Sequence, residues 1–283
     1  MATAKAASGY WTVGWHKPVG WHKPEILESQ AVRESPFGVR LSRLLSQRRL
    51  TFNTSVEQLR AVLVREAGLS GGDLAAVIED GAAPDPDFVR KLAPALGIHG
   101  ADLFVIAGLP VPDDLASAWP TSPWDVGSIV GYLVRMDADQ RRQMEQLIRS
   151  LPVQPRHVSA PSDDYPDIPG ALLLRLLRNR NIRPCNARIL KEVGDGPYVS
   201  DSTVIGLGRG TVVITPQYVT AFAHLLGYPP SEMVALTGVG PVVADARVHP
   251  ASAEIAAMAW QARLLDSEQL SAVVAAAHSM RQA

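Results

Sequence analysis

Apolar residues recur at helical spacing along most of the chain. Beyond Phe37 they stand three or four positions apart in successive stripes: Leu41, Leu44 and Leu45; Leu59, Val62 and Leu63; and Phe88, Leu92 and Leu96. Offsets of three and four place side chains on one face of an α-helix, whereas a half-buried strand requires alternation, which is scarce here. The pattern therefore predicts an all-α protein built from amphipathic helices.

Two stretches interrupt this pattern. In residues 1–35, glycine and proline break every possible element, and the hexapeptide VGWHKP occurs twice in succession between Val13 and Pro24. Residues 152–169 contain five prolines and no apolar stripe. We therefore predict a flexible N-terminal arm over 1–35, a solvated linker over 152–169, and two domains over 36–151 and 170–283.

The duplicated hexapeptide contains residues that could bind a metal ion, nucleic acid or a partner. His16 and His22 could hold a metal ion, but two histidines with no further ligand make a poor site. The Trp and Lys residues beside them could instead touch nucleic acid or a partner. We favour a short duplication tolerated in a flexible arm, and we predict no metal site.

The two predicted domains are inexact copies of each other. The segment FVRKLAPALGIHGADLFVIAGLP aligns with YVTAFAHLLGYPPSEMVALTGVG at a constant offset of 130 residues. Upstream, GVRLSRLL from Gly38 aligns with GALLLRLL from Gly170 at an offset of 132, which places Arg48 on Arg180. A repeat of this length indicates tandem copies of one helical unit of ordinary domain size.

Each copy ends in a predicted helical hairpin. Asp137 stands three residues before Gln140 in the first copy, and Asp266 stands three before Gln269 in the second. This spacing is typical of a capping box at a helix start. We favour the interpretation that each hairpin packs on its own domain, with an apolar dimer seam as the alternative.

Composition limits the classes of function. The one cysteine, Cys185, excludes an intramolecular disulfide framework and is expected to be a small buried or half-buried hydrophobe. No apolar run is long enough to span a membrane and no apolar leader opens the chain, so we expect a cytoplasmic protein with no membrane partner. The excess of Arg over Lys, with abundant Ala and Gly, suggests a GC-rich bacterial genome.

The order of segments within each copy resembles a known family. The segments that carry the likeness are VSDSTVIGLGRG (199–210), IEDG (78–81) and the paired LGIHGADLFVIAGL and LGYPPSEMVALTGV. Over residues 37–110 and 170–240 the chain resembles the Cro/repressor-type helix-turn-helix family, the lambda-repressor-like five-helix domain. The resemblance implies an all-α fold of two tandem helix-turn-helix domains, and sequence-specific DNA binding in transcription regulation, usually as a dimer.

Residues 202–215 are also compatible with structures other than a helix. The segment STVIGLGRGTVVIT could form two β-branched strands around a Gly-Arg-Gly turn, or a glycine-rich phosphate loop. A dinucleotide-binding loop needs a buried strand before it and an acidic residue about twenty positions after it, and the sequence around this segment does not combine the two. The hairpin stays open, because Gly206 and Gly208 weaken any helix at this place.

Local charge distinguishes the two copies. Although the whole chain has a formal net charge of −1, residues 170–210 carry seven basic against three acidic side chains, a net charge of +4. Residues 38–81 carry six basic against five acidic side chains, a net charge of +1. Because DNA affinity comes mainly from phosphate neutralisation, the second copy is the better DNA-binding candidate and the first is expected to be mainly architectural.

The resemblance places the recognition helix of the second copy at 199–210. The candidate base-reading residues are Ser200, Asp201, Ser202, Thr203 and Arg209. The candidate phosphate-binding residues are Arg175, Arg180, Arg188 and Lys191. Two features depart from the family pattern, namely Gly208 where the family usually carries Glu and an insertion at 195–197.

These observations predict a DNA-binding transcriptional regulator whose partner is double-stranded DNA and which could form a homodimer. No catalytic motif occurs among the scattered histidines and carboxylates, so we expect neither enzyme activity nor a cofactor. The alternative is a degenerate helix-turn-helix module that binds proteins and not DNA. The near-neutral net charge and the acidic end of the first recognition helix, at Glu79 and Asp80, keep this alternative open.

Overall fold

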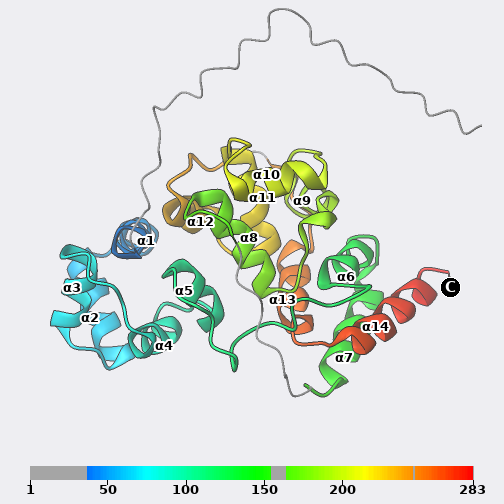
Figure 1. Cartoon of the computed structure of the whole chain (residues 1–283), viewed down its shortest axis with the longest axis horizontal. Coiled ribbons are helices and arrows are strands. Elements are labelled where there is room, and N and C mark those ends of the chain that lie inside the picture. The colour runs from blue at the N-terminus through cyan, green and yellow to red at the C-terminus, as the bar shows by residue number, and fades with distance from the viewer. Residues whose placement is uncertain (1–36, 154–163, 245, 283) are drawn as a thin grey trace, which may run out of the picture. The chain divides into compact units, whose positions relative to one another are not determined.

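The described part of the chain is entirely helical. The computed structural model describes residues 37–153, 164–244 and 246–282, and these form fourteen α-helices and one short 3₁₀ helix, with no strand (Figure 1). The all-α prediction is therefore confirmed for this part. The predicted arm, with the duplicated hexapeptide, His16 and His22, lies outside the described residues. No helix within the described ranges is long and apolar enough to cross a membrane.

The helices fall into two consecutive sets of seven. The first set is α1 (Phe37–Phe52), α2 (Val56–Ala67), α3 (Gly71–Glu79), α4 (Pro86–Ala95), α5 (Gly100–Ile106), α6 (Val126–Leu133) and α7 (Ala138–Ser150). The second set is α8 (Pro169–Asn179), η1 (Pro184–Asn186) with α9 (Arg188–Gly194), α10 (Asp201–Arg209), α11 (Pro216–Leu226), α12 (Pro230–Thr237), α13 (Ser252–Ala262) and α14 (Ser267–Met280). We call these sets the first half and the second half.

Equivalent signals begin and end equivalent helices in the two halves. Asp137 and Asp266 cap α7 and α14, and each forms the capping box with the Gln three residues later that the sequence predicted. Gly97 and Gly227 follow α4 and α11 with φ of 62° and 77°. Only glycine adopts this left-handed conformation without strain, so the repeat in sequence is also a repeat in local structure.

One close contact between helices recurs in both halves. Gly38 in α1 lies so near α3 that an added Cβ would stand 2.0 Å from the carbonyl oxygen of Val77. Gly170 in α8 lies equally near α10, where a Cβ would stand 2.1 Å from the carbonyl oxygen of Leu207. A glycine at this position therefore allows the first helix of each half to touch the backbone of the third.

The halves contact each other through reciprocal pairs of helices. Helix α1 of the first half packs against α12 of the second, and their counterparts α8 and α5 pack against each other. Arg48 of α1 donates to both carboxylate oxygens of Glu232 at 2.9 and 3.0 Å. Arg180, the C-cap residue of α8, donates in the same way to Asp102 at 3.1 and 2.9 Å. This exchange of equivalent contacts is what a two-fold related interface produces, here within one chain.

The second of these ion pairs is fully buried and the first is not. The side chains of Arg180 and Asp102 are 1% and 0% exposed, against 15% and 14% for Arg48 and Glu232. Asp102 also accepts hydrogen bonds from the amide of Asn179 at 2.9 Å and the hydroxyl of Tyr228 at 3.0 Å. Burial, together with the charge of Asp102, raises the pKa of Tyr228 well above its usual value, which keeps its hydroxyl protonated as a donor.

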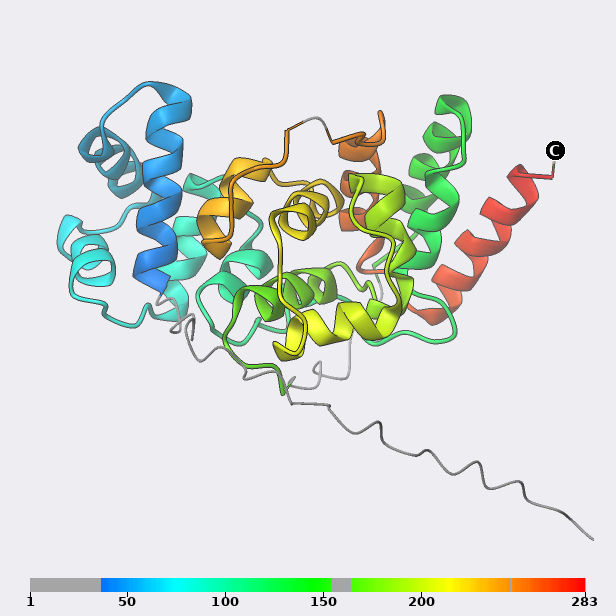
Figure 2. The ribbon, with the colours of Figure 1, turned by 90° about the horizontal axis from the view of Figure 1, so that it is seen from above.

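The C-terminal hairpins do not pack as the favoured interpretation expected. Helix α6 packs mainly against α13 and α14, and α7 also packs against both, so the hairpins cover each other across the halves. Figures 1 and 2 show them gathered together, with the red α14 beside the green α6 and α7. Of the second hairpin, α13 also packs on α11 of its own half. The apolar seam considered for dimerisation is therefore filled within one chain.

The two capping glutamines extend this cross-half packing. Gln140 at the start of α7 donates through Nε2 to the carbonyl oxygen of Met280 at the end of α14, at 2.8 Å. Gln269 at the start of α14 donates to the carbonyl oxygen of Pro152, just beyond α7, at 2.7 Å. The start of each helix is thus bonded to the end of the other.

Replacing Gln140 by alanine should cost more stability than replacing a capping-box glutamine elsewhere. We expect Gln140→Ala to lower the free energy of unfolding by about 1–2 kcal/mol, because it loses a cap and a cross-half hydrogen bond. Gln58 forms the capping box of α2 on an exposed surface, so Gln58→Ala is the matched control, with a loss of about 0.5–1 kcal/mol. Urea denaturation followed by circular dichroism measures both, and equal losses would contradict the cross-half role.

A single hydrophobic core runs through both halves. The described end of the predicted linker also takes part in packing, because Asp167 forms an ion pair with the buried Arg40 at 2.7 Å. Helix α8 begins at Pro169, the last residue of the predicted linker. The halves are therefore repeats that share one interior, and residues 164–169 are not the solvated spacer that their composition suggested.

Candidate nucleic-acid interface

The segment that resembles a helix-turn-helix in the second half runs from η1 through α9 to α10. The connection between α9 and α10 covers residues 195–200, whereas that between α2 and α3 covers only 68–70. The longer connection contains the insertion seen in the sequence. It opens with Asp195 in the left-handed conformation, at φ 57°.

Residues 201–209 form a helix and not the β-hairpin that the sequence left open. The two glycines in this helix serve close packing. A Cβ on Gly206 would stand 2.7 Å from a methyl group of Val212, and one on Gly208 would stand 2.6 Å from a methyl group of Leu174 and 3.0 Å from the ring of Tyr165. Close packing of α10 on α8, and on the residues that follow α10, therefore compensates for the low helix propensity of glycine.

The first turn of α10 presents the small polar side chains predicted to read bases. Ser200 is the N-cap, and its hydroxyl accepts a hydrogen bond from the backbone N–H of Thr203 at 3.3 Å. Ser200, Asp201 and Ser202 are exposed, and Thr203 is half-buried. The carboxylate of Asp201 also accepts from the backbone N–H of Ala187 at 3.3 Å. Four of the five base-reading candidates thus meet at one helix end.

The fifth candidate, Arg209, lies at the other end of α10. It is the last residue of the helix, is exposed, and precedes Gly210, which closes the helix with φ 72°. A helix rises about 1.5 Å per residue, so Arg209 is roughly 12 Å along the axis from the first turn. Such a distance suits a phosphate contact better than a contact to the same bases.

Arg188 and Lys191 lie on α9 with exposed side chains and carboxylate partners. Arg188 pairs with Glu192 at 3.3 Å, and Lys191 donates to Asp195 one turn later. The hydrogen bond from Lys191, joined by the backbone N–H of Arg247, lowers the pKa of Asp195. These surface pairs are weak enough to open, so a phosphate could compete for either cation.

The remaining two phosphate candidates lie in the interior. Arg180 is buried in the ion pair with Asp102 and also donates to the carbonyl oxygens of Leu176 and Leu226, at 3.0 and 2.6 Å. It has no surface to offer a phosphate, which corrects the sequence-based expectation. Arg175 is half-buried and donates to the carbonyl oxygen of Tyr165. The structure therefore separates Arg175 and Arg180 from the exposed cations of α9.

The equivalent surface in the first half is less basic. Helix α3 starts at exposed Gly71 and Gly72 after the N-cap Ser70, and ends in the exposed Glu79. Arg60 of α2 donates to Glu79 at 2.6 Å, so a basic side chain of this surface is already neutralised. This arrangement agrees with the charge difference between the copies.

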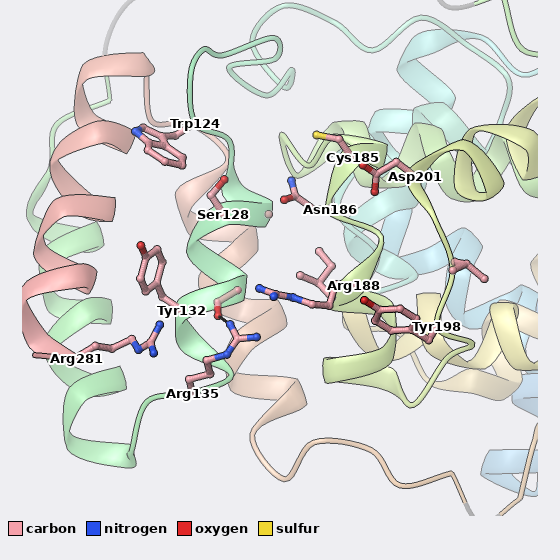
Figure 3. Close-up of a pocket in the computed structure, with 14 residues that line it drawn as sticks. Trp124, Ser128, Tyr132, Arg135, Cys185, Asn186, Arg188, Tyr198, Asp201 and Arg281 are labelled. Carbon is pink, nitrogen blue, oxygen red and sulfur yellow. Dashed lines mark hydrogen bonds between the residues drawn. The ribbon is translucent and has the colours of Figure 1, made fainter.

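A cleft borders the candidate interface. It has a volume of about 510 Å³ and lies between α6 with the end of α14 on one side and η1, α9 and the start of α10 on the other (Figure 3). Arg188 and Asp201 line it, together with Tyr132, Arg135 and Arg281, which the sequence did not single out. These residues are far apart along the chain, so only the pairing of the halves places them together.

Cys185 lies at this cleft and differs from its expectation. Its side chain is exposed, although partial burial raises the pKa of the thiol and the nearby carboxylates of Asp125 and Asp201 act in the same direction. The prediction that Cys185 is a buried or half-buried hydrophobe is therefore wrong. The raised pKa keeps the thiol protonated near neutral pH, which makes it a weak nucleophile.

Comparisons of the chain with protein-family models, with curated proteins and with solved structures gave no match.

Proposed function

We propose that the protein is a DNA-binding transcriptional regulator in which α10 of the second half reads the major groove. The observation that carries this proposal is the exposed first turn of α10, capped by Ser200 and fixed in orientation by the contact of Gly170 with the backbone of Leu207. A helix held in this way and presenting small polar groups at its N-terminus suits insertion into the groove.

In this proposal, only exposed basic side chains contact the DNA phosphates. Arg188 and Lys191 on α9 and Arg209 at the end of α10 are the proposed anchors, while Ser200, Ser202 and Thr203 are the proposed base contacts. Asp201 is the acid among them and accepts best from a cytosine amino group. Arg180 is left out because its role is to join the halves.

One chain supplies both halves of the proposed DNA-binding unit. A homodimer of a single-copy repressor uses one surface twice, and here the equivalent surfaces are occupied by the other half through α1 with α12, α8 with α5, and the paired hairpins. The homodimer considered from the sequence is therefore not needed. A monomer with unequal halves would bind an operator without two-fold symmetry.

The competing proposal, a protein-binding module, also has specific support. Asp201 at the start of α10 would repel phosphates, and Lys191 already has a carboxylate partner. In the first half, Asp80 adds exposed negative charge just after α3, and Glu79 is paired with Arg60. DNA binding measured against salt separates the two classes.

The decisive measurement is selection of bound fragments from random genomic DNA, followed by titration of a selected duplex at several salt concentrations. We expect a preferred site, and a slope of log affinity against log salt that corresponds to a few phosphate contacts. Arg209→Ala should weaken binding about tenfold and reduce the slope by about one contact. Glu79→Ala is the matched control on α3 and should leave affinity unchanged. Absence of binding at low salt would contradict the regulator and favour the protein-binding module.

A further inference from the structure

The cleft beside α10 is built from parts of both halves. Gly127 and Gly131 of α6 form a flat wall, and a Cβ on Gly127 would stand 2.4 Å from the amide nitrogen of Asn186 on the facing segment. Asn186 is itself held by the buried Asp125, to which it donates at 2.8 and 2.9 Å. These contacts join the two walls at one end of the cleft, which has a volume of about 510 Å³.

Positive charge dominates the lining of the cleft. Arg135 and Arg281 stand on one side and Arg188 on the other, and Figure 3 shows Arg188 reaching across the gap toward Arg135. Asp201 is the lining carboxylate, and Glu192, outside the lining, pairs with both Arg135 and Arg188. Three guanidinium groups thus face two carboxylates, which leaves a net positive charge at the cleft.

Three aromatic rings also line the cleft, those of Trp124, Tyr132 and Tyr198. Trp124 and Tyr198 are 41% and 79% exposed, unusually open for side chains of this size. Tyr132 lies on the α6 wall with the guanidinium carbon of Arg281 at 5.8 Å from its ring centre (Figure 3). Concave sites with exposed rings and a few convergent charges are the usual form of small-molecule sites.

We propose that this cleft binds a small organic anion that carries an aromatic ring, such as an aromatic carboxylate or sulfonate. Arg281 and Arg188 bind the anionic group from opposite walls, because guanidinium groups match the geometry of such anions. Tyr132 and Trp124 cover the ring. A volume of about 510 Å³ admits a ligand of two or three rings. This proposal does not rest on the proposed DNA binding, although Arg188 has a part in both.

The test uses the full chain and two fluorescent probes with similar ring systems but different charge. Anilinonaphthalene sulfonate is the anion, and phenylnaphthylamine is its neutral counterpart. We expect saturable binding of the sulfonate and weakening of about tenfold in Arg281→Gln, with no change in the weaker binding of the neutral amine. Arg142→Gln replaces an exposed arginine of α7 outside the cleft and should bind the sulfonate as the natural sequence does.

Cys185 gives an independent readout of where the probe binds. It is the one cysteine of the chain and lines the cleft, so alkylation by iodoacetamide reports access to this place. Saturating sulfonate should slow alkylation severalfold in the natural sequence, and Arg281→Gln should need about tenfold more sulfonate for the same protection. Equal affinity for the two probes, equal binding by Arg281→Gln, or unchanged alkylation of Cys185 at saturation would overturn the proposal.

Discussion

Asp102→Ala is expected to be among the most destabilising single substitutions in this protein, with a loss of about 3–5 kcal/mol in the free energy of unfolding. The substitution leaves the guanidinium of Arg180 buried with no counter-charge, and it removes the acceptor used by Asn179 and Tyr228. Urea denaturation followed by circular dichroism measures the loss.

The equivalent ion pair, between Arg48 and Glu232, provides the control. Glu232→Ala breaks the ion pair with Arg48, whose partially exposed guanidinium can recover water as a partner. We expect a loss of about 1–2 kcal/mol there. A double variant, Asp102→Leu with Arg180→Met, should be more stable than Asp102→Ala, because it removes both buried charges and fills the space with apolar atoms. Equal losses for Asp102→Ala and Glu232→Ala would show that burial does not set the strength of this contact.

Gly170→Ala is the second substitution with a large expected effect. The added methyl group would stand 2.1 Å from the carbonyl oxygen of Leu207, so α8 and α10 must move apart. Overpacking of this kind costs about 1–3 kcal/mol. We expect a loss at the upper end of this range, because the methyl group would clash with a backbone carbonyl, which cannot move aside as a flexible side chain can. Thermal and urea denaturation both measure it.

Gly72→Ala serves as the matched control for this prediction. Gly72 also lies in a helix, but an added Cβ would meet only the hydroxyl of Ser70, at an ordinary 3.7 Å. Alanine should therefore leave stability unchanged or raise it by up to about 1 kcal/mol. If the proposed function is correct, Gly170→Ala should also weaken DNA binding at temperatures where the variant remains folded, because it displaces α10. A stable Gly170→Ala variant would contradict the close contact itself.

Several features of the fold could be predicted from the sequence. Apolar spacing of three and four residues predicted the helices, and Asp followed three residues later by Gln predicted the starts of α7 and α14. The offset of 130 predicted the repeat, which the structure shows as two sets of helices in the same order. These predictions succeed because capping and amphipathic periodicity depend on residues within a few positions of one another.

The alignment of the two halves also contains a signal for the ion pairs between them. Arg48 falls on Arg180, and Asp102 falls on Glu232 at the offset of 130, so each half carries one basic and one acidic residue at equivalent positions. The sequence predicts a phosphate contact for Arg180, because exposed and buried arginines look alike in a sequence. Its burial depends on α5 of the other half, which no local pattern reveals.

The sequence by itself determined the helical class, the helix starts, the internal repeat and the excess of basic residues in the second half, since each follows from local spacing or composition. Only the tertiary structure decided that the hairpins pair across the halves, that Arg180 is an interior ion-pair partner, and that Arg135, Arg188 and Arg281 share one cleft. Those outcomes depend on which apolar faces cover each other, and such pairing joins residues that are far apart along the chain.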